Sequence, residues 1–249
     1  MDRDEPKTRA GGSSPSGGVR RAAQALALAL CGWISLAAGP AQAASMTFRV
    51  EPLETEGCGA RCPHVIAAEG VIEADTPQAF VDFLRQGGSD ANLRRIVFFN
   101  SRGGNVVASM VFGHILRELK VAGVVGRFES GSPYAGECLS ACVYAMMGAV
   151  RRVAPPGSEV ALHRMSIIET ESVGGDERAG GGRSDTHSPS TRLTRSFADQ
   201  SMIAVLKRYA QRMGVNPALV GAAESLPPDS VHVLSREEMR RWSFATSQF

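Results

Sequence analysis

The hydrophobic pattern after residue 43 alternates between short apolar runs and longer amphipathic segments. The short runs are rich in β-branched and aromatic residues, which favours β-strands. They are Thr47–Val50, Val65–Ile72, Arg95–Asn100, Gly123–Arg127, Glu159–His163 and Val231–Leu234. Because strands that alternate with helices are typical of α/β proteins, we predict one α/β domain over residues 44–249.

The amphipathic segments between the short runs predict helices. Asp75-Thr76-Pro77 offers a capping hydroxyl and a first-turn proline, so a helix is expected to begin there. A second helix is predicted from about Asn105 to Lys120, because apolar side chains recur there every four residues. That apolar stripe consists of Val107, Val111, Ile115 and Leu119. The other predicted helices are Ser140–Ala149, Met202–Met213, a short one after Asn216-Pro217, and one capped at Ser235-Arg236-Glu237-Glu238.

Residues 1–43 have the pattern of a secretory signal peptide. Five basic residues precede an apolar run from Ala22 to Ala38, and the small-x-small sequence Ala41-Gln42-Ala43 follows it. The apolar run approaches the length of a membrane span, so an uncleaved N-terminal anchor is the alternative. We therefore expect a periplasmic or secreted protein, which contacts the membrane only if this segment is retained.

The charge balance changes once that segment is set aside. Of the 27 basic and 25 acidic side chains, five and three lie in residues 1–43, so 22 of each remain. A formal charge of zero offers no electrostatic reason to bind nucleic acid or an anionic membrane.

Residues 171–190 interrupt the alternation of strands and helices. Gly, Ser, Asp, Arg and Thr dominate this stretch, with Gly180-Gly181-Gly182 at its centre and Val173 and Ala179 as its apolar side chains. Such a composition cannot bury much surface, so we predict a flexible insertion here.

Four cysteines after the signal segment form two close pairs, Cys58/Cys62 and Cys138/Cys142. An oxidising compartment favours disulfides, with Cys58–Cys62 as the favoured local pair and a cross-link between the pairs as the alternative. Four thiolates could also form a structural zinc site, but three intervening residues in each pair fit that site less well than two. We predict disulfides, with no metal.

Three features that could carry chemistry lie at predicted strand and helix ends. Gly103-Gly104 follows a strand and precedes a helix, where free backbone amides could bind an oxyanion, although a tight turn is the plainer explanation. Ser140 begins a small-residue helix, where a serine is more often a cap than a nucleophile. His163 closes an apolar strand, and alone it would be a satisfied core residue. Together they indicate a nucleophile, a base and an oxyanion site.

The order of these features resembles the Clp-protease-like branch of the crotonase superfamily. The motifs Cys-x-Ser-Ala-Cys and Leu-Ser-x-Glu-Glu are similar to those of its exported bacterial members, and the resemblance covers about Val65 to Trp242 without the insertion. It implies a repeated β-β-α spiral fold, a homo-oligomer and polypeptide substrates. The matching segments are Ser101-Arg102-Gly103-Gly104, Ser140, Gly148, Arg151-Arg152, Pro155-Pro156 and Ala161-Leu162-His163.

The resemblance also implies roles for single residues. Ser140 matches the nucleophile and His163 the general base. The amides of Gly103 or Gly104, together with that of Ala141, match the oxyanion hole.

Two positions depart from the family pattern. Asp229 is the best match to the triad aspartate, although it stands about two residues early, and Glu224 is further off. Arg102 stands where the family has proline, which puts the conformation of this turn in question more than the presence of its amides.

The leading hypothesis is an exported serine hydrolase, specifically a peptidase, that needs no cofactor. The second is an oligomeric binding or assembly module that keeps the fold without catalysis. Acyl-CoA chemistry of the crotonase type has no use for a Ser–His pair, and coenzyme A is a cytoplasmic reagent. A Ser–Lys dyad is disfavoured, because Lys120 and Lys207 are the only lysines after the signal segment and neither matches a base.

Overall fold

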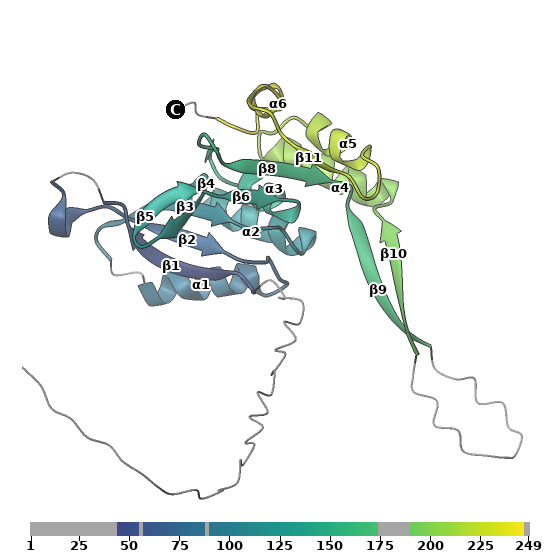
Figure 1. The fold of residues 1–249 in the computed structure, drawn as a ribbon, viewed down its shortest axis with the longest axis horizontal. Helices are drawn as coiled ribbons and strands as arrows, with labels where there is room; N and C mark the ends of the chain where they lie inside the picture. Colours follow the sequence, from purple (N-terminus) through teal and green to yellow (C-terminus); the bar gives the residue numbers. More distant parts are fainter. Residues whose placement is uncertain (1–43, 55–56, 88–89, 174–189, 247–249) are drawn as a thin grey trace, which may run out of the picture. The chain divides into compact units, whose positions relative to one another are not determined.

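The computed structural model describes residues 44–54, 57–87, 90–173 and 190–246. The predicted signal segment and most of the predicted insertion, residues 174–189, lie outside the described residues. The described part has the mixed α/β fold that the sequence predicts (Figure 1). Within these ranges, no helix combines the length and apolar character needed to cross a bilayer.

The larger sheet has six strands. Its middle is parallel, and antiparallel strands flank it on both sides, with the order β1-β2-β3-β4-β5 and β7 also paired with β4. The strands are β1 (Thr47–Pro52), β2 (His64–Glu69), β3 (Leu93–Asn100), β4 (Ala122–Glu129), β5 (Ser132–Ala135) and β7 (Arg151–Val153).

A smaller sheet of three strands positions the predicted site. Its order is β11 (Val231–Val233), β8 (Glu159–His163) and β6 (Glu137–Leu139). Strands β6 and β8 are parallel, with Leu139 paired to Ala161, so the residues that follow them leave the sheet at the same edge. An isolated bridge between Ser101 and Cys138 joins the end of β3 to β6. This edge therefore brings together chain segments that are far apart in the sequence.

The predicted helices are confirmed in number and order within the described ranges. The helices are α1 (Thr76–Gly87), α2 (Val106–Glu118), α3 (Ala141–Met147), α4 (Gln200–Arg212), α5 (Ala218–Glu224) and α6 (Arg236–Arg241). The predicted capping box of α6 is present, because Ser235 and Glu238 bond each other's backbone amides. Every residue of α3 is buried, large side chains such as Tyr144 and Met146 included.

Helix α2 turns a different face to the core than its four-residue repeat suggests. Val107, Val111 and Leu119 remain 53%, 47% and 38% exposed. They line open grooves against α1, and the buried stripe is the neighbouring one. That buried stripe includes Ala108, Phe112 and Leu116. Because two adjacent stripes are apolar, the pattern predicts the helix but does not select its buried face.

A two-stranded ribbon flanks the predicted insertion. Strands β9 (Ser166–Val173) and β10 (Ser190–Phe197) pair antiparallel along their whole length and form a sheet of their own (Figure 1). The polar composition around residue 171 did not indicate these strands. Their ladder brings the two ends of the insertion together.

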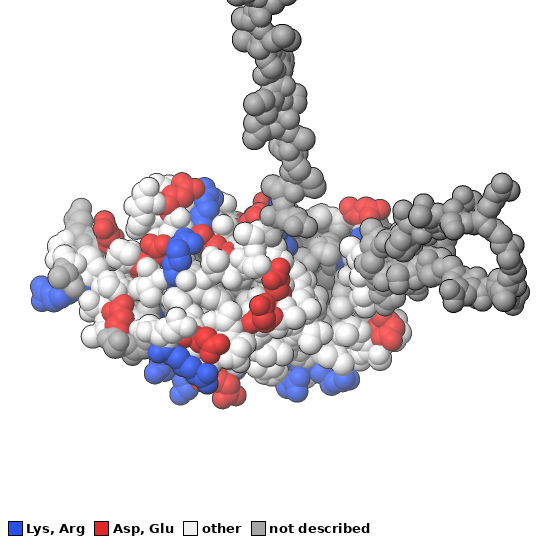
Figure 2. All heavy atoms as spheres, turned by 90° about the horizontal axis from the view of Figure 1, so that it is seen from below, with Lys and Arg blue, Asp and Glu red and all other residues white. Residues whose placement is uncertain are grey.

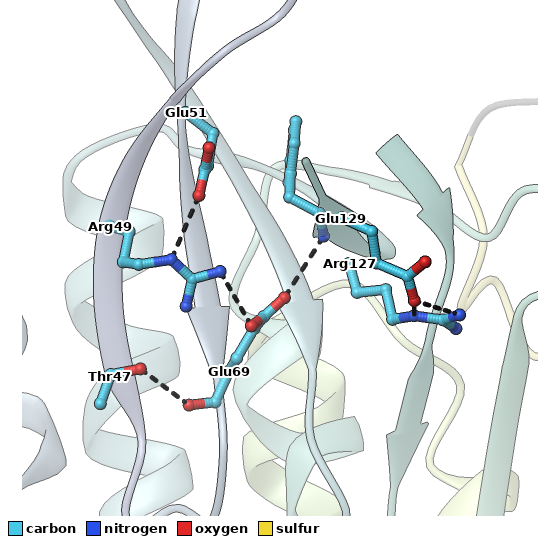
Figure 3. Close-up of polar contacts among 7 residues, drawn as sticks. Thr47, Arg49, Glu51, Glu69, Arg127 and Glu129 are labelled. Carbon is cyan, nitrogen blue, oxygen red and sulfur yellow. Dashed lines mark hydrogen bonds and ion pairs between the residues drawn. The ribbon is translucent and has the colours of Figure 1, made fainter. Parts of the chain in front are cut away.

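Charged side chains are interspersed rather than gathered by sign on the face shown in Figure 2. Figure 3 shows two examples in the large sheet, one on β1 and β2 and the other on β4. Arg49 binds Glu51 at 3.1 Å and Glu69 at 3.0 Å, and Arg127 binds Glu129 at 2.7 Å. These pairs are partly exposed, so each contributes at most about 1 kcal/mol to stability.

Candidate active site

Ser140 occupies a strained turn between β6 and α3. Its φ is 55° and its ψ is −122°, in a region that residues with a side chain rarely adopt. Such a conformation costs about 1–3 kcal/mol and persists where the surrounding structure enforces it. The Ser140 amide donates to the Ala161 carbonyl at 2.9 Å, which ties this turn to β8. A strained turn from strand to helix is also how hydrolases present a nucleophilic serine.

A disulfide between Cys138 and Cys142 brackets Ser140, and both half-cystines are fully buried. Cys58 and Cys62 form the second disulfide, so the pairing is local in both cases. The bridged sulfurs are therefore not thiolate ligands for zinc. Among the described residues, no group of three or more His, Cys, Asp or Glu side chains is arranged to hold a metal ion.

The Gly103-Gly104 turn packs directly against Ser140. A Cβ added to Gly103 would lie 2.8 Å from Ser140 Cβ and 2.9 Å from the Ala141 amide nitrogen. Gly103 also has a φ of 104°, which only glycine adopts readily. The structure thus brings the predicted turn, the predicted nucleophile and Ala141 into contact.

Two amides in this contact region are available to bind an oxyanion. The Gly103 amide donates to Ser101 Oγ at 3.2 Å. Among the described residues, no acceptor is bonded to the amides of Gly104 or Ala141. Ala141 is the first residue of α3, where an amide has no partner within the helix. We therefore favour Gly104 over Gly103 as the partner of Ala141.

Arg102 does not disturb this turn, although the family pattern has proline there. Its side chain is 73% exposed, and its Nε lies 3.6 Å from Glu137 Oε1. The two glycines, and not residue 102, adopt the positive φ values of the turn.

Replacing Gly103 by alanine is expected to disrupt the site. The new methyl group would overlap Ser140 and the Ala141 amide, and the φ of 104° adds strain, so we expect a loss of about 2–4 kcal/mol of unfolding free energy. Gly87→Ala is the matched control, because open space surrounds Gly87 at the end of α1. Urea unfolding measures both. A Gly103→Ala protein as stable as the control would contradict this packing.

His163 is the last residue of β8. It stands two positions beyond Ala161, so the two side chains lie on the same face of the strand. Its Nδ1 lies 2.7 Å from the Arg164 carbonyl oxygen. A carbonyl only accepts hydrogen bonds, so Nδ1 carries the proton and donates it to this oxygen. In the neutral ring, Nε2 then keeps a lone pair, which is the state that a general base requires.

Asp229 lies apart from His163. Its carboxylate forms an ion pair with Arg195 at 2.7 Å, and its side chain is 88% exposed. No hydrogen bond or ion pair joins Asp229 to His163 in the described part of the chain. The structure therefore places Ser140 and His163 just beyond the paired residues Leu139 and Ala161, with no hydrogen bond between their side chains in the described part of the chain, and leaves Asp229 in solvent.

Glu224 stands further than Asp229 from the position of the family aspartate in the sequence, yet it contacts the main chain two residues after His163. Glu224 ends α5, and its Oε1 accepts a hydrogen bond from the Met165 amide at 3.3 Å. Burial raises the pKa of Glu224, whereas the Met165 amide and the charges of Arg164 and His163 act to lower it. No sequence motif indicates this contact, because its partner is a main-chain amide that almost any residue type would supply.

Comparisons with known proteins are limited to solved structures, since no family model and no curated protein matches the chain. One similar structure is a serine-to-alanine mutant of 1510-N, a membrane-bound stomatin-specific protease. It is 18% identical, covers 72% of this chain and 75% of its own, and gives a TM-score of 0.44. Another is an asparagine-to-aspartate mutant of ClpP1 from Listeria monocytogenes, at 15% identity, 73% and 88% coverage and a TM-score of 0.41. The mixed α/β fold of this chain resembles these two structures at a modest level.

Proposed function

We propose that this protein is an exported serine hydrolase that cleaves peptide bonds, with Ser140 as nucleophile and His163 as general base. One observation carries the proposal: Ser140 is held at a φ of 55° with the Gly103 backbone packed against it. A strained serine at a strand end, beside a glycine turn with a free amide, has no evident role in folding. It suits a residue whose hydroxyl must be presented to a substrate.

The proposed mechanism uses only groups at this edge of the small sheet. His163 Nε2 takes the proton from Ser140 Oγ, which attacks the substrate carbonyl carbon. The amides of Gly104 and Ala141 donate to the oxyanion that forms. The protonated His163 then gives its proton to the leaving amine, and the peptide bond breaks. Water repeats these steps on the acyl-enzyme and releases the acid.

Substrate class and location belong to the proposal as well. The motif resemblance implies polypeptide substrates and self-association, and we infer both for this chain. The two disulfides suit an oxidising compartment, where the N-terminal pattern would direct the protein. The substrates would then be polypeptides already accessible outside the cytoplasm.

Labelling with a fluorophosphonate tests the proposal. The wild-type protein is expected to gain one phosphonyl group on Ser140, located by mass spectrometry of its peptides. Ser140→Ala is the control for site, and Ser130→Ala, at an exposed turn, is the control for a bystander serine. Labelling that persists in Ser140→Ala, or a folded wild-type protein that never reacts, would count against the hydrolase.

A binding or assembly module is the second candidate. The exposed apolar stripe of α2 favours it, because Val107 and Val111 line a groove of about 390 Å³ against α1. Apolar surface that is rimmed by polar residues often marks a protein interface. A folded protein that does not react with the probe yet self-associates would support this candidate.

A further inference from the structure

Glu224 carries a buried carboxylate that the proposed mechanism leaves unused. Helix α5, which Glu224 ends, packs against β8. Glu224 Oε2 is buried, and in the described part of the chain no donor reaches it. A buried acceptor without a donor costs about 1–3 kcal/mol. Such a group is retained more readily for a role outside folding.

One peptide group stands between this carboxylate and His163. Its carbonyl, from Arg164, accepts from His163 Nδ1 at 2.7 Å. Its amide, from Met165, donates to Glu224 Oε1 at 3.3 Å. Because the carbonyl and amide of a trans peptide point in opposite directions, His163 and Glu224 bind its two ends. A hydrogen bond to a carboxylate polarises the peptide and makes its carbonyl a stronger acceptor.

The charges near Glu224 favour the same arrangement. Although burial raises the pKa of Glu224, the charges of Arg164 and His163 act to lower it, so each interacts with the carboxylate. An ionised Glu224 is therefore placed to stabilise a positive charge on either neighbour. The Arg164 guanidinium stacks over the Phe197 ring at 4.3 Å. Of these two charges, that of Arg164 lowers the pKa of Glu224 more than that of His163 does.

Other titratable groups lie on α3 and β11, which both contact β8. Tyr144 lies on α3, one turn after Ser140, and burial followed by the charge of Glu224 raises its pKa. On β11, Val231 pairs with His163, and the adjacent His232 is bonded to Glu238 at 2.8 Å. Of these groups, Glu224 alone is a carboxylate linked to His163 through a shared peptide.

We propose that Glu224 is the positioning residue for the base of the site, acting on His163 through the Arg164–Met165 peptide group. This inference rests on the proposed function. When His163 takes the proton from Ser140, the ring becomes a cation. The peptide carbonyl holds its Nδ1–H in place, and the carboxylate stabilises the positive charge. Asp229 has no part in this step.

The Glu224→Gln variant tests the role of the charge, because glutamine keeps an oxygen that can accept from the Met165 amide. We expect kcat/KM to fall about 10- to 100-fold, mainly through kcat. The ascending limb of the pH profile should move to lower pH, since the protonated ring loses a stabilising charge. Asp229→Asn is the matched control and should change kcat/KM less than about two-fold.

Stability separates positioning from a structural role. The folded-state pKa of Glu224 is raised, so its contribution to stability is full below the unfolded-state pKa and is lost as pH rises through the folded-state value. At neutral pH the ionised carboxylate therefore costs stability, and Glu224→Gln should be at least as stable as wild type. A large loss of stability in Glu224→Gln would instead indicate a structural role and overturn the proposal.

Nuclear magnetic resonance of His163 in the Ser140→Ala protein tests the same link without catalysis. We expect the Nδ1–H tautomer, and a titration that moves to lower pH when Glu224→Gln is added. An Nε2–H tautomer, an unchanged titration, or an equal shift in Asp229→Asn would overturn the role of Glu224. If the wild-type protein is not labelled at Ser140 while His163 titrates as expected, the result counts against the hydrolase proposal but not against the link to Glu224. If the protein with both Ser140→Ala and Glu224→Gln does not fold, the His163 tautomer in the Ser140→Ala protein tests the link.

Discussion

The Ser140→Ala protein is expected to lose at least about 10⁴-fold in kcat/KM toward peptide or ester substrates. The substitution removes the nucleophilic oxygen, and what the oxyanion amides retain cannot replace it. The fold should survive, because alanine fits the space of a half-buried serine. Steady-state hydrolysis, with circular dichroism to confirm folding, measures this. A variant that keeps a tenth of the wild-type rate would exclude Ser140 as nucleophile.

Ser140→Gly extends the test to backbone strain. Glycine adopts a φ of 55° without penalty, so we expect activity to vanish while unfolding free energy rises by about 1 kcal/mol. Ser130→Gly is the matched control, because Ser130 has a φ of 50° in the exposed turn after β4. It should gain similar stability and keep full activity. If Ser140→Gly were less stable than wild type, strain at the nucleophile would be disproved.

Arg152→Met is expected to be the most destabilising single change described here, at about 3–5 kcal/mol. Arg152 is 3% exposed, and its guanidinium donates to five main-chain carbonyls. Each hydrogen bond from a charged group contributes about 1.5–3 kcal/mol, partly offset by the cost of burying the charge. The acceptors are the carbonyls of Phe244, Met147, Ala149, Met213 and Ser243.

These bonds hold the C-terminal segment and the end of α3 together. Burial, and secondarily the charge of Arg117, lower the pKa of Arg152 to about 10, so the side chain remains charged at neutral pH. Methionine fills a similar volume but leaves the carbonyls without a donor. Urea unfolding with intact disulfides measures the loss, and Arg240→Met, on the exposed face of α6, should change stability by less than about 0.5 kcal/mol. A loss below 1 kcal/mol for Arg152→Met would contradict this account.

Much of the site could be predicted because its parts carry local signals. Paired glycines after a strand, a serine before a small-residue helix and a histidine closing a strand each stand at an element end. The structure places Gly103, Ser140 and Ala141 in contact. The disulfides were predicted with local pairing favoured and a cross-link as the alternative, and the structure has both local pairs.

The carboxylate was harder to predict. Asp229 was chosen by its distance along the chain from a family motif, yet the turn before β11 points it toward Arg195. Glu224 contacts the main chain of Met165, and a main-chain partner can be any residue type. No residue pattern could therefore have singled it out.

The sequence by itself determined the six helices and the strands β1, β2, β3, β4, β8 and β11 of the described residues, together with the capping box of α6, because these depend on neighbours within a few residues. Only the tertiary structure decided which apolar stripe of α2 is buried and which carboxylate is linked to His163. Both outcomes depend on packing between elements distant in the sequence: α2 against α3, and α5 against β8. Local propensity does not distinguish Val111 from Phe112, or Asp229 from Glu224, but burial against a partner element does.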